Sequence, residues 1–247
     1  MKIKGKRKYF RALIIDKKRI DDLEAFLQDY ADTINYEAET HQGTTIEFTG
    51  KDELTGYDNY GKRRIKTLTI SGRQDYSYVI NLEFGEPYSF VPFFRYGVTF
   101  EGNYSLNSIS EETQFQRQLN DWLKKATASY WIIGKFSLYK SLFYISLFIA
   151  MYSLYHHPRI TPLNLSIGHF LLLCLIATII VVLAYAFDNC IMASLFPAVS
   201  FRWGEESNRQ DRIASLRNGV LWSVIIAFLI GVFAGVAGTY FSHFLGV

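Results

Sequence analysis

The chain has 247 residues, enough for one or two domains, with 26 Lys/Arg against 23 Asp/Glu and a net charge of +3. Its two cysteines, Cys174 and Cys190, are too few for a disulfide-stabilised scaffold. Charge is unevenly distributed, since 20 of the 26 Lys/Arg precede residue 136 and long apolar runs dominate residues 136–247. The sequence therefore predicts a soluble N-terminal part joined to a membrane part. We expect no signal peptide, because the apolar run after the basic start is short and is broken by Arg11.

Residues 1–110 alternate between extended and helical patterns. The aromatic and β-branched stretch 8–16 predicts a strand, and residues 17–31 place apolar side chains on one helical face. Two hairpins are predicted over 33–50 and 63–84, with a short helix in "KDELTGYDN" between them. A further extended stretch over 93–102 completes a cytoplasmic α+β domain, with a largely antiparallel sheet and one flanking helix.

Residues 111–135 predict a helical stalk. Ser110 precedes two acidic residues and fits an N-cap. Apolar residues then recur at helical spacing, namely Phe115, Leu119, Trp122, Ala126, Tyr130 and Ile133. Because no proline intervenes before Pro158, we expect one helix from 111 to 155, bent at Gly134, that couples the sheet domain to the membrane. Its apolar stripe requires a partner, either another subunit or the 205–217 segment.

Three apolar segments, 136–155, 165–187 and 220–244, are long enough to cross a bilayer, and 188–219 connects the last two. One side of the predicted membrane domain (136–247) carries only Arg159, whereas the other carries Lys124, Lys125, Lys135, Lys140, Arg202, Arg209, Arg212 and Arg217. Because Lys and Arg favour the cytoplasmic side, the N-terminal domain and the 188–219 connection are expected in the cytoplasm of a bacterium and the C-terminus outside. Asp188 is expected at the inner surface of this inner membrane, within reach of water or headgroups.

The third predicted span carries small residues at strict four-residue spacing: Gly219, Ser223, Ala227, Gly231, Gly235 and Thr239. Small residues allow close approach of helix backbones in lipid. The stripe fits packing against the first two spans of the same chain, and it fits equally well an interface between copies in a homo-oligomer. Any pore would require the oligomer, since three helices are few to enclose one.

The connection "FPAVSFRWGEESNRQDRIASLRNG" (196–219) has two interpretations. Its aromatic start predicts an interfacial belt of Phe196, Pro197, Phe201 and Trp203. The spacing of a capping box predicts a helix from Asn208, with Arg212 and Arg217 just below the membrane. The segment is then either a plain interfacial loop or a coupling element that includes Phe201, Trp203, Arg212 and Arg217.

Motifs for phosphate loops, nucleophile elbows, zinc sites and dinucleotide binding are not found, so we expect no enzyme, no metal and no cofactor. Residues 2–19 hold nine Lys/Arg against one acid. If "GKRRIK" faces this start, a basic surface forms for a phosphorylated ligand such as a nucleotide, or for lipid headgroups or nucleic acid. Its members would be Lys6, Arg7, Lys8, Lys62, Arg63 and Arg64. A solvated, charged strand edge explains the N-terminal cluster equally well.

The stretches "FPAVSFRWGEE" and "DELTGYDNYGKRRIKTLTI" resemble a pattern of uncharacterised bacterial inner-membrane proteins. These have a cytoplasmic α+β domain and two to four spanning helices, and some are suspected effectors of anti-phage defence. The predicted stalk and the small-residue stripe favour a membrane-anchored sensor or effector that oligomerises and couples a cytoplasmic protein or phosphorylated ligand to a membrane response, and the resemblance implies a role in phage defence. The alternative is a passive anchor or accessory subunit of a larger membrane complex.

Overall fold

The computed structural model describes residues 2–75, 77–85, 94–137, 139–144, 148 and 178–245. They fall into two units, Met1–Ser207 and Asn208–Val247, rather than the three regions expected, 1–110, 111–135 and 136–247. The strands are β1 (Ile3–Tyr9), β2 (Leu13–Asp16), β3 (Thr33–Thr40), β4 (Thr45–Phe48), β5 (Ile65–Gln74), β6 (Ser77–Phe84), β7 (Phe100–Leu106) and β8 (Val199–Arg202). The helices are α1 (Lys17–Leu27), α2 (Lys51–Gly56), η1 (Gly61–Arg63), α3 (Ile109–Ala126), α4 (Trp131–Lys135), η2 (Phe187–Met192), α7 (Ala193–Leu195) and α8 (Glu205–Leu245).

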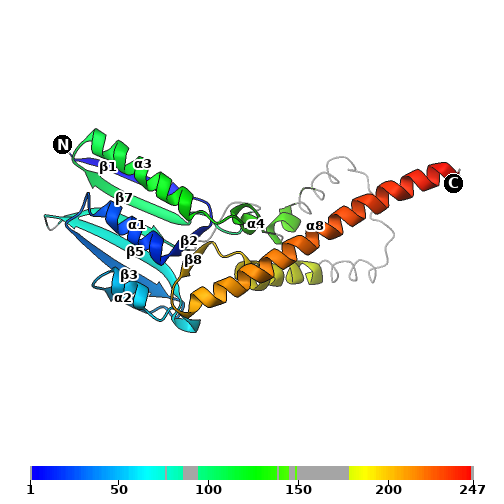
Figure 1. The fold of residues 1–247 in the computed structure, drawn as a ribbon, viewed down its shortest axis with the longest axis horizontal. Helices are drawn as coiled ribbons and strands as arrows, with labels where there is room; N and C mark the ends of the chain where they lie inside the picture. Colours follow the sequence, from blue (N-terminus) through cyan, green and yellow to red (C-terminus); the bar gives the residue numbers. More distant parts are fainter. Residues whose placement is uncertain are drawn as a thin grey trace, which may run out of the picture. The chain divides into compact units, whose positions relative to one another are not determined.

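Six strands form one antiparallel sheet in the order β1-β7-β6-β5-β3-β4 (Figure 1). The two predicted hairpins are present as β3–β4 and β5–β6, and α2 lies between them. The predicted strand over 8–16 is wrong in one respect. The strand is interrupted at Phe10–Ala12. As a result, β1 joins the large sheet and β2 pairs with β8 in a separate parallel sheet. The expected α+β class of the N-terminal part is confirmed.

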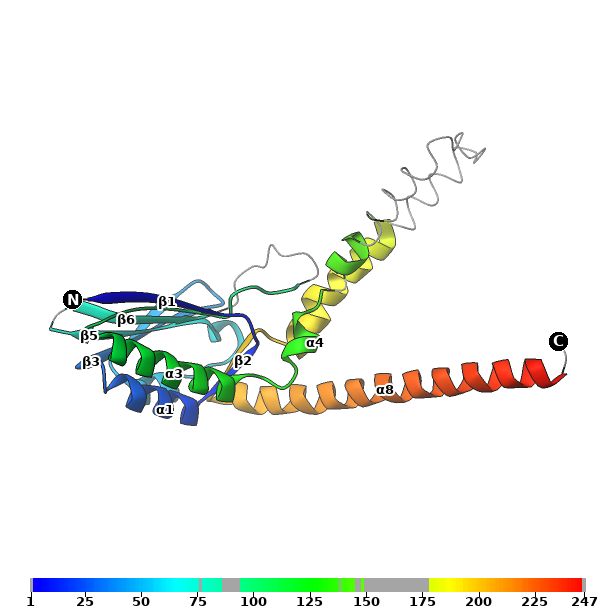
Figure 2. The ribbon, with the colours of Figure 1, turned by 90° about the horizontal axis from the view of Figure 1, so that it is seen from above.

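The two faces of the large sheet differ in chemistry because successive residues of a strand point to opposite sides. One cross-strand row is apolar and buried, and consists of Ala38, Leu68, Phe84 and Phe100. The next row is polar, and consists of Glu37, Thr69, Glu83, Glu101 and Lys8. Helices α1 and α3 cover the apolar face, and Figure 2 shows both on the same side of the sheet.

Helix α3 is a core helix and not part of a stalk. Its buried side chains are Phe115, Leu119, Trp122, Leu123 and Ala126, and the Phe115 ring lies 4.8 Å from that of Tyr104 in β7. The cap is Ser108, not Ser110, since the Ser108 hydroxyl accepts from the Glu111 N–H at 3.2 Å. The helix ends at Ala126, since Thr127 is extended, and α4 is a separate short helix that ends at Lys135. The predicted continuous stalk over 111–135 is therefore wrong, because the chain's own sheet covers the apolar stripe.

The aromatic segment that follows the apolar helix Thr178–Leu195 belongs to the core of the α+β domain. Phe196, Phe201 and Trp203 are 2%, 4% and 1% exposed, and Val199–Arg202 forms β8. The predicted aromatic belt is thus wrong, since these rings pack among protein side chains. Gly204 has φ +60, and a Cβ there would lie 3.3 Å from the Asn59 nitrogen and the Tyr57 oxygen, so glycine suits this turn. Helix α8 begins directly afterwards at Glu205, earlier than the predicted Asn208.

Among the described residues, one helical stretch is long and apolar enough to cross a membrane. This stretch, Thr178–Leu195, has a mean hydropathy of 1.8, and only 11% of it is buried. It extends beyond the predicted end at 187 through the π-helical η2 and α7. The predicted first span (136–155) and the start of the second (165–177) lie largely outside the described residues. The predicted third span, 220–244, lies within α8.

The burial of Trp203 yields a stability prediction. Trp203→Ala should lower the free energy of unfolding of the soluble part by about 3–5 kcal/mol, because a large core side chain is replaced by a cavity. Trp222→Ala is the matched control, since Trp222 is 64% exposed on α8. Urea titration of the detergent-solubilised chain, followed by near-UV circular dichroism, measures both. Equal midpoints for the two variants would contradict the core position of Trp203.

Candidate functional site

Four segments, 10–13, 94–96, 127–137 and 196–199, meet where the chain leaves the sheet and its covering helices and returns to them. We call this region the junction. The Leu13 N–H donates to the Ala198 oxygen at 2.8 Å, and the Ala128 N–H donates to the Ala12 oxygen at 2.8 Å. The start of β2 therefore lies between the outgoing and the returning chain.

The outgoing and returning segments are also in direct contact. The Tyr130 hydroxyl donates to the Pro197 oxygen at 3.2 Å, and the Tyr130 and Phe196 ring centroids are 5.8 Å apart. Gly134, the predicted bend, lies in α4 against Phe196, and a Cβ at this position would be 2.9 Å from the Phe196 Cβ. Arg95 donates to the Phe196 oxygen and so adds a third segment to the contact.

Beyond the junction, β8 is held along its length and at its end. It pairs in parallel with β2, from Leu13↔Val199 to Asp16↔Arg202. The buried side chain of Asn59 donates to the Phe201 oxygen at 2.9 Å and accepts from the Ile65 N–H at 2.8 Å. This amide links the end of β8 to the first residue of β5, since it satisfies one backbone group in each.

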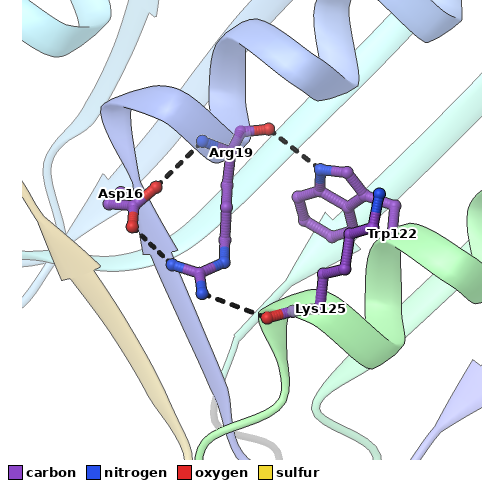
Figure 3. A network of polar contacts seen from close by, with 4 residues as sticks. All are labelled: Asp16, Arg19, Trp122 and Lys125. Atoms are coloured by element: carbon purple, nitrogen blue, oxygen red, sulfur yellow. Dashed lines mark hydrogen bonds and ion pairs between the residues drawn. The ribbon is translucent and has the colours of Figure 1, made fainter.

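Figure 3 shows how β2 is tied to the helical layer. Asp16 ends β2 and caps α1, accepting from the Arg19 N–H at 2.9 Å and pairing with the Arg19 guanidinium. The same guanidinium donates to the Lys125 oxygen at 3.0 Å, in the last turn of α3. The Trp122 indole N–H donates to the Arg19 oxygen at 2.9 Å. These hydrogen bonds join the end of β2 to both α1 and α3.

On the other side of the junction, Asp188 fixes the apolar helix to the outgoing chain. Its carboxylate accepts from the Ser137 hydroxyl at 2.6 Å and from the Tyr139 N–H at 2.9 Å. Asp188 is 4% exposed, so the predicted position within reach of water or headgroups is wrong. The physical reason is capping, because residues 139–144 are helical and the N–H groups in the first turn of a helix need acceptors outside it.

The structure does not bring the two predicted basic clusters together. Lys6 and Lys8 lie on edge strand β1, where both pair with Glu101, and Arg7 points to the other face of the sheet. Lys62, Arg63 and Arg64 precede β5, three strand spacings or about 14 Å away across the sheet and further along it. Arg64 pairs with buried Glu206 at 3.6 Å, so it supports the start of α8.

The remaining predicted residues divide between the core and α8. Phe201 and Trp203 are core residues, Arg212 is exposed and Arg217 is buried. The stripe Gly219, Ser223, Ala227, Gly231, Gly235 and Thr239 lies on one continuous helix, where the Ser223 hydroxyl donates to the Gly219 oxygen at 2.9 Å. In the described part of the chain, no three His, Cys, Asp or Glu side chains cluster to hold a metal ion.

Sequence reasoning missed the junction as a site. The one local signal for β8 is the extended, apolar pattern of "AVSFRW", which composition alone also assigns to a membrane interface. Comparisons with protein-family models, with curated proteins and with solved structures gave no match.

Asn59 provides a test of how firmly β8 is held. Asn59→Ala leaves the Phe201 carbonyl and the Ile65 N–H buried without this partner, which should cost about 2–4 kcal/mol of unfolding free energy. Asn81→Ala, at an exposed position of the same sheet, should cost little. Urea titration measures the total loss of unfolding free energy, and hydrogen exchange should show that protection is lost mainly at residues 199–203. A uniform loss across the sheet would argue against a specific link to β8.

The ion pair on β1 predicts a pH effect. A hydrogen bond from Lys6 lowers the pKa of Glu101, so this carboxylate stabilises the fold above its unfolded pKa. That contribution is lost as pH falls through the lower folded pKa. Glu101→Gln should therefore cost up to about 1 kcal/mol at neutral pH and nothing at strongly acidic pH. Thermal unfolding at several pH values measures the difference, with Glu47→Gln as the control. A constant cost at every pH would show that charge is not its origin.

Proposed function

We propose that the protein is a membrane-anchored sensor or effector whose soluble part receives a cue and changes the state of its membrane helices. The supporting observation is the double attachment at the junction. The chain leaves the soluble part after α3 and returns through β8, whose side chains are buried in the same core. A passive anchor needs only one covalent link to its domain, so the second, packed connection favours coupling.

The contacts provide a physical route for that coupling. Asp188 joins the apolar helix to Ser137 and Tyr139, and Phe196 follows that helix directly into the junction. Close-packed interiors transmit displacement instead of absorbing it. A shift of the apolar helix would therefore change the β2–β8 pair and, through Arg19, the contact with α3.

The remaining parts of the proposal come from the sequence. Three spans, a cytoplasmic soluble part and an external C-terminus follow from the apolar segments and the distribution of Lys and Arg. The small-residue stripe supports a homo-oligomer, and the resemblance to suspected defence effectors supports a response to phage. The cue would be a cytoplasmic protein or a phosphorylated ligand such as a nucleotide. The competing function is a passive anchor or accessory subunit.

Hydrogen exchange of the full chain in lipid nanodiscs distinguishes the two functions. Asp188→Ala perturbs the apolar helix, and with coupling it should reduce the protection of β2 and β8 amides by about tenfold or more. Ile180→Ala, at an exposed position of the same helix, is the control and should leave those amides protected. If Asp188→Ala affects only its own helix and the first turn from Tyr139, the protein is a passive anchor.

A further inference from the structure

The junction exposes large apolar side chains. Phe10, Ile132 and Phe136 are 47%, 55% and 52% exposed, and Ile133 is also exposed. A soluble surface rarely gathers such side chains without a binding partner. Three of the four come from α4 and its end, and Phe10 comes from the chain just before β2.

Two cations lie among these residues, and both are held against aromatic rings. The Arg11 guanidinium is 4.7 Å from the Trp131 ring centroid. The Lys135 ammonium is 4.4 Å from the ring of Phe94 and 5.9 Å from that of Phe10. None of residues 9–13, 94–99 and 127–137 is acidic. We call Phe10, Arg11, Ile132, Ile133, Lys135 and Phe136 the junction patch, which is both apolar and positively charged.

The junction patch continues into an apolar groove. A hollow of about 430 Å³ is lined by Ile132, Ile133, Phe136, Ser137, Ser141, Phe187 and Met192. Phe187 and Met192 belong to Thr178–Leu195, the helix that is apolar enough to cross a membrane. Lys135 contacts the Phe10 ring, and Ile132, Ile133 and Phe136 line the groove together with Phe187 and Met192, so residues of the junction patch and that helix share its wall. Aromatic and basic residues together at the end of a spanning helix are typical of the headgroup layer.

We propose that the junction patch binds an anionic phospholipid, with its phosphate beside Arg11 and Lys135 and the start of an acyl chain in the groove. This rests on the membrane attachment in the proposed function and identifies the lipid class. An acidic protein would use the cations but not the groove, and an apolar protein surface would leave both cations without a counter-charge. The phosphate of an anionic lipid pairs with the two cations, and its acyl chain covers the exposed apolar side chains and the groove.

The test uses the full chain in nanodiscs of phosphatidylcholine with or without phosphatidylglycerol. A spin label at Ile132→Cys, with Cys174 and Cys190 changed to serine, reports whether oxygen or a water-soluble nickel chelate reaches the patch. With phosphatidylglycerol, the label should be more accessible to oxygen than to the nickel chelate. The double variant Arg11→Glu/Lys135→Glu should reverse this order of accessibility. The enrichment of phosphatidylglycerol retained by the protein should fall about fivefold for each cation lost. Lys17→Glu/Lys18→Glu, at exposed positions of α1 outside the patch, is the matched control.

Alkaline extraction of the same samples separates the two proposals. A chain that resists extraction, but whose label stays open to the nickel chelate in both lipids, would overturn the lipid site and leave membrane attachment intact. A chain released by alkali would overturn membrane attachment itself. Shielding that requires several copies per nanodisc, and does not depend on phosphatidylglycerol, would show a protein interface in place of the lipid site.

Discussion

The parallel pairing of β2 with β8 is the constraint on which the α+β domain depends. Leu13 and Ile15 are fully buried, so the backbone groups of β2 cannot be satisfied by water. β8 supplies their partners, although it follows more than a hundred residues later in the chain. Closing so long a loop costs little more than closing a short one, because the entropy grows only with the logarithm of its length. The returning segment is thus an integral part of the domain.

Parallel strands cannot be joined by a tight turn and need a crossover connection. Here the last part of that crossover runs from α4 through the apolar helix to Phe196. The apolar helix Thr178–Leu195 therefore lies within an insertion between β2 and β8, whereas α8 follows β8 at the end of the chain. Because Tyr130 and Gly134 contact the chain around Phe196, the two ends of the insertion lie together. Adjacent ends are what allow a domain to accept an insertion without distortion.

Much of the local structure could be predicted from the sequence. The hairpins, α1 and α2 depend on alternation, helical spacing and turn residues, which are signals within a short window. The role of α3 could not be predicted, because periodicity shows that Phe115 and Leu119 share a face but not what covers it. The prediction that Phe201 and Trp203 lie at a membrane interface was wrong for the same reason. Aromatic residues beside an apolar run suit a lipid interface and a protein core equally, and only the distant strand β2 decides.

The candidate site shows the same limit for charged residues. Lys6 and Lys8 were recognised as a basic cluster, but their partner Glu101 lies on β7, and sheet register alone places it there. Arg11 belongs to the same basic start, yet it lies at the junction because the chain breaks between β1 and β2. A single run of positive charge is thus divided between a strand edge and the junction patch. The junction patch combines this charge with exposed Ile132 and Phe136, and that combination, rather than the number of cations, favours a membrane lipid over a soluble anion.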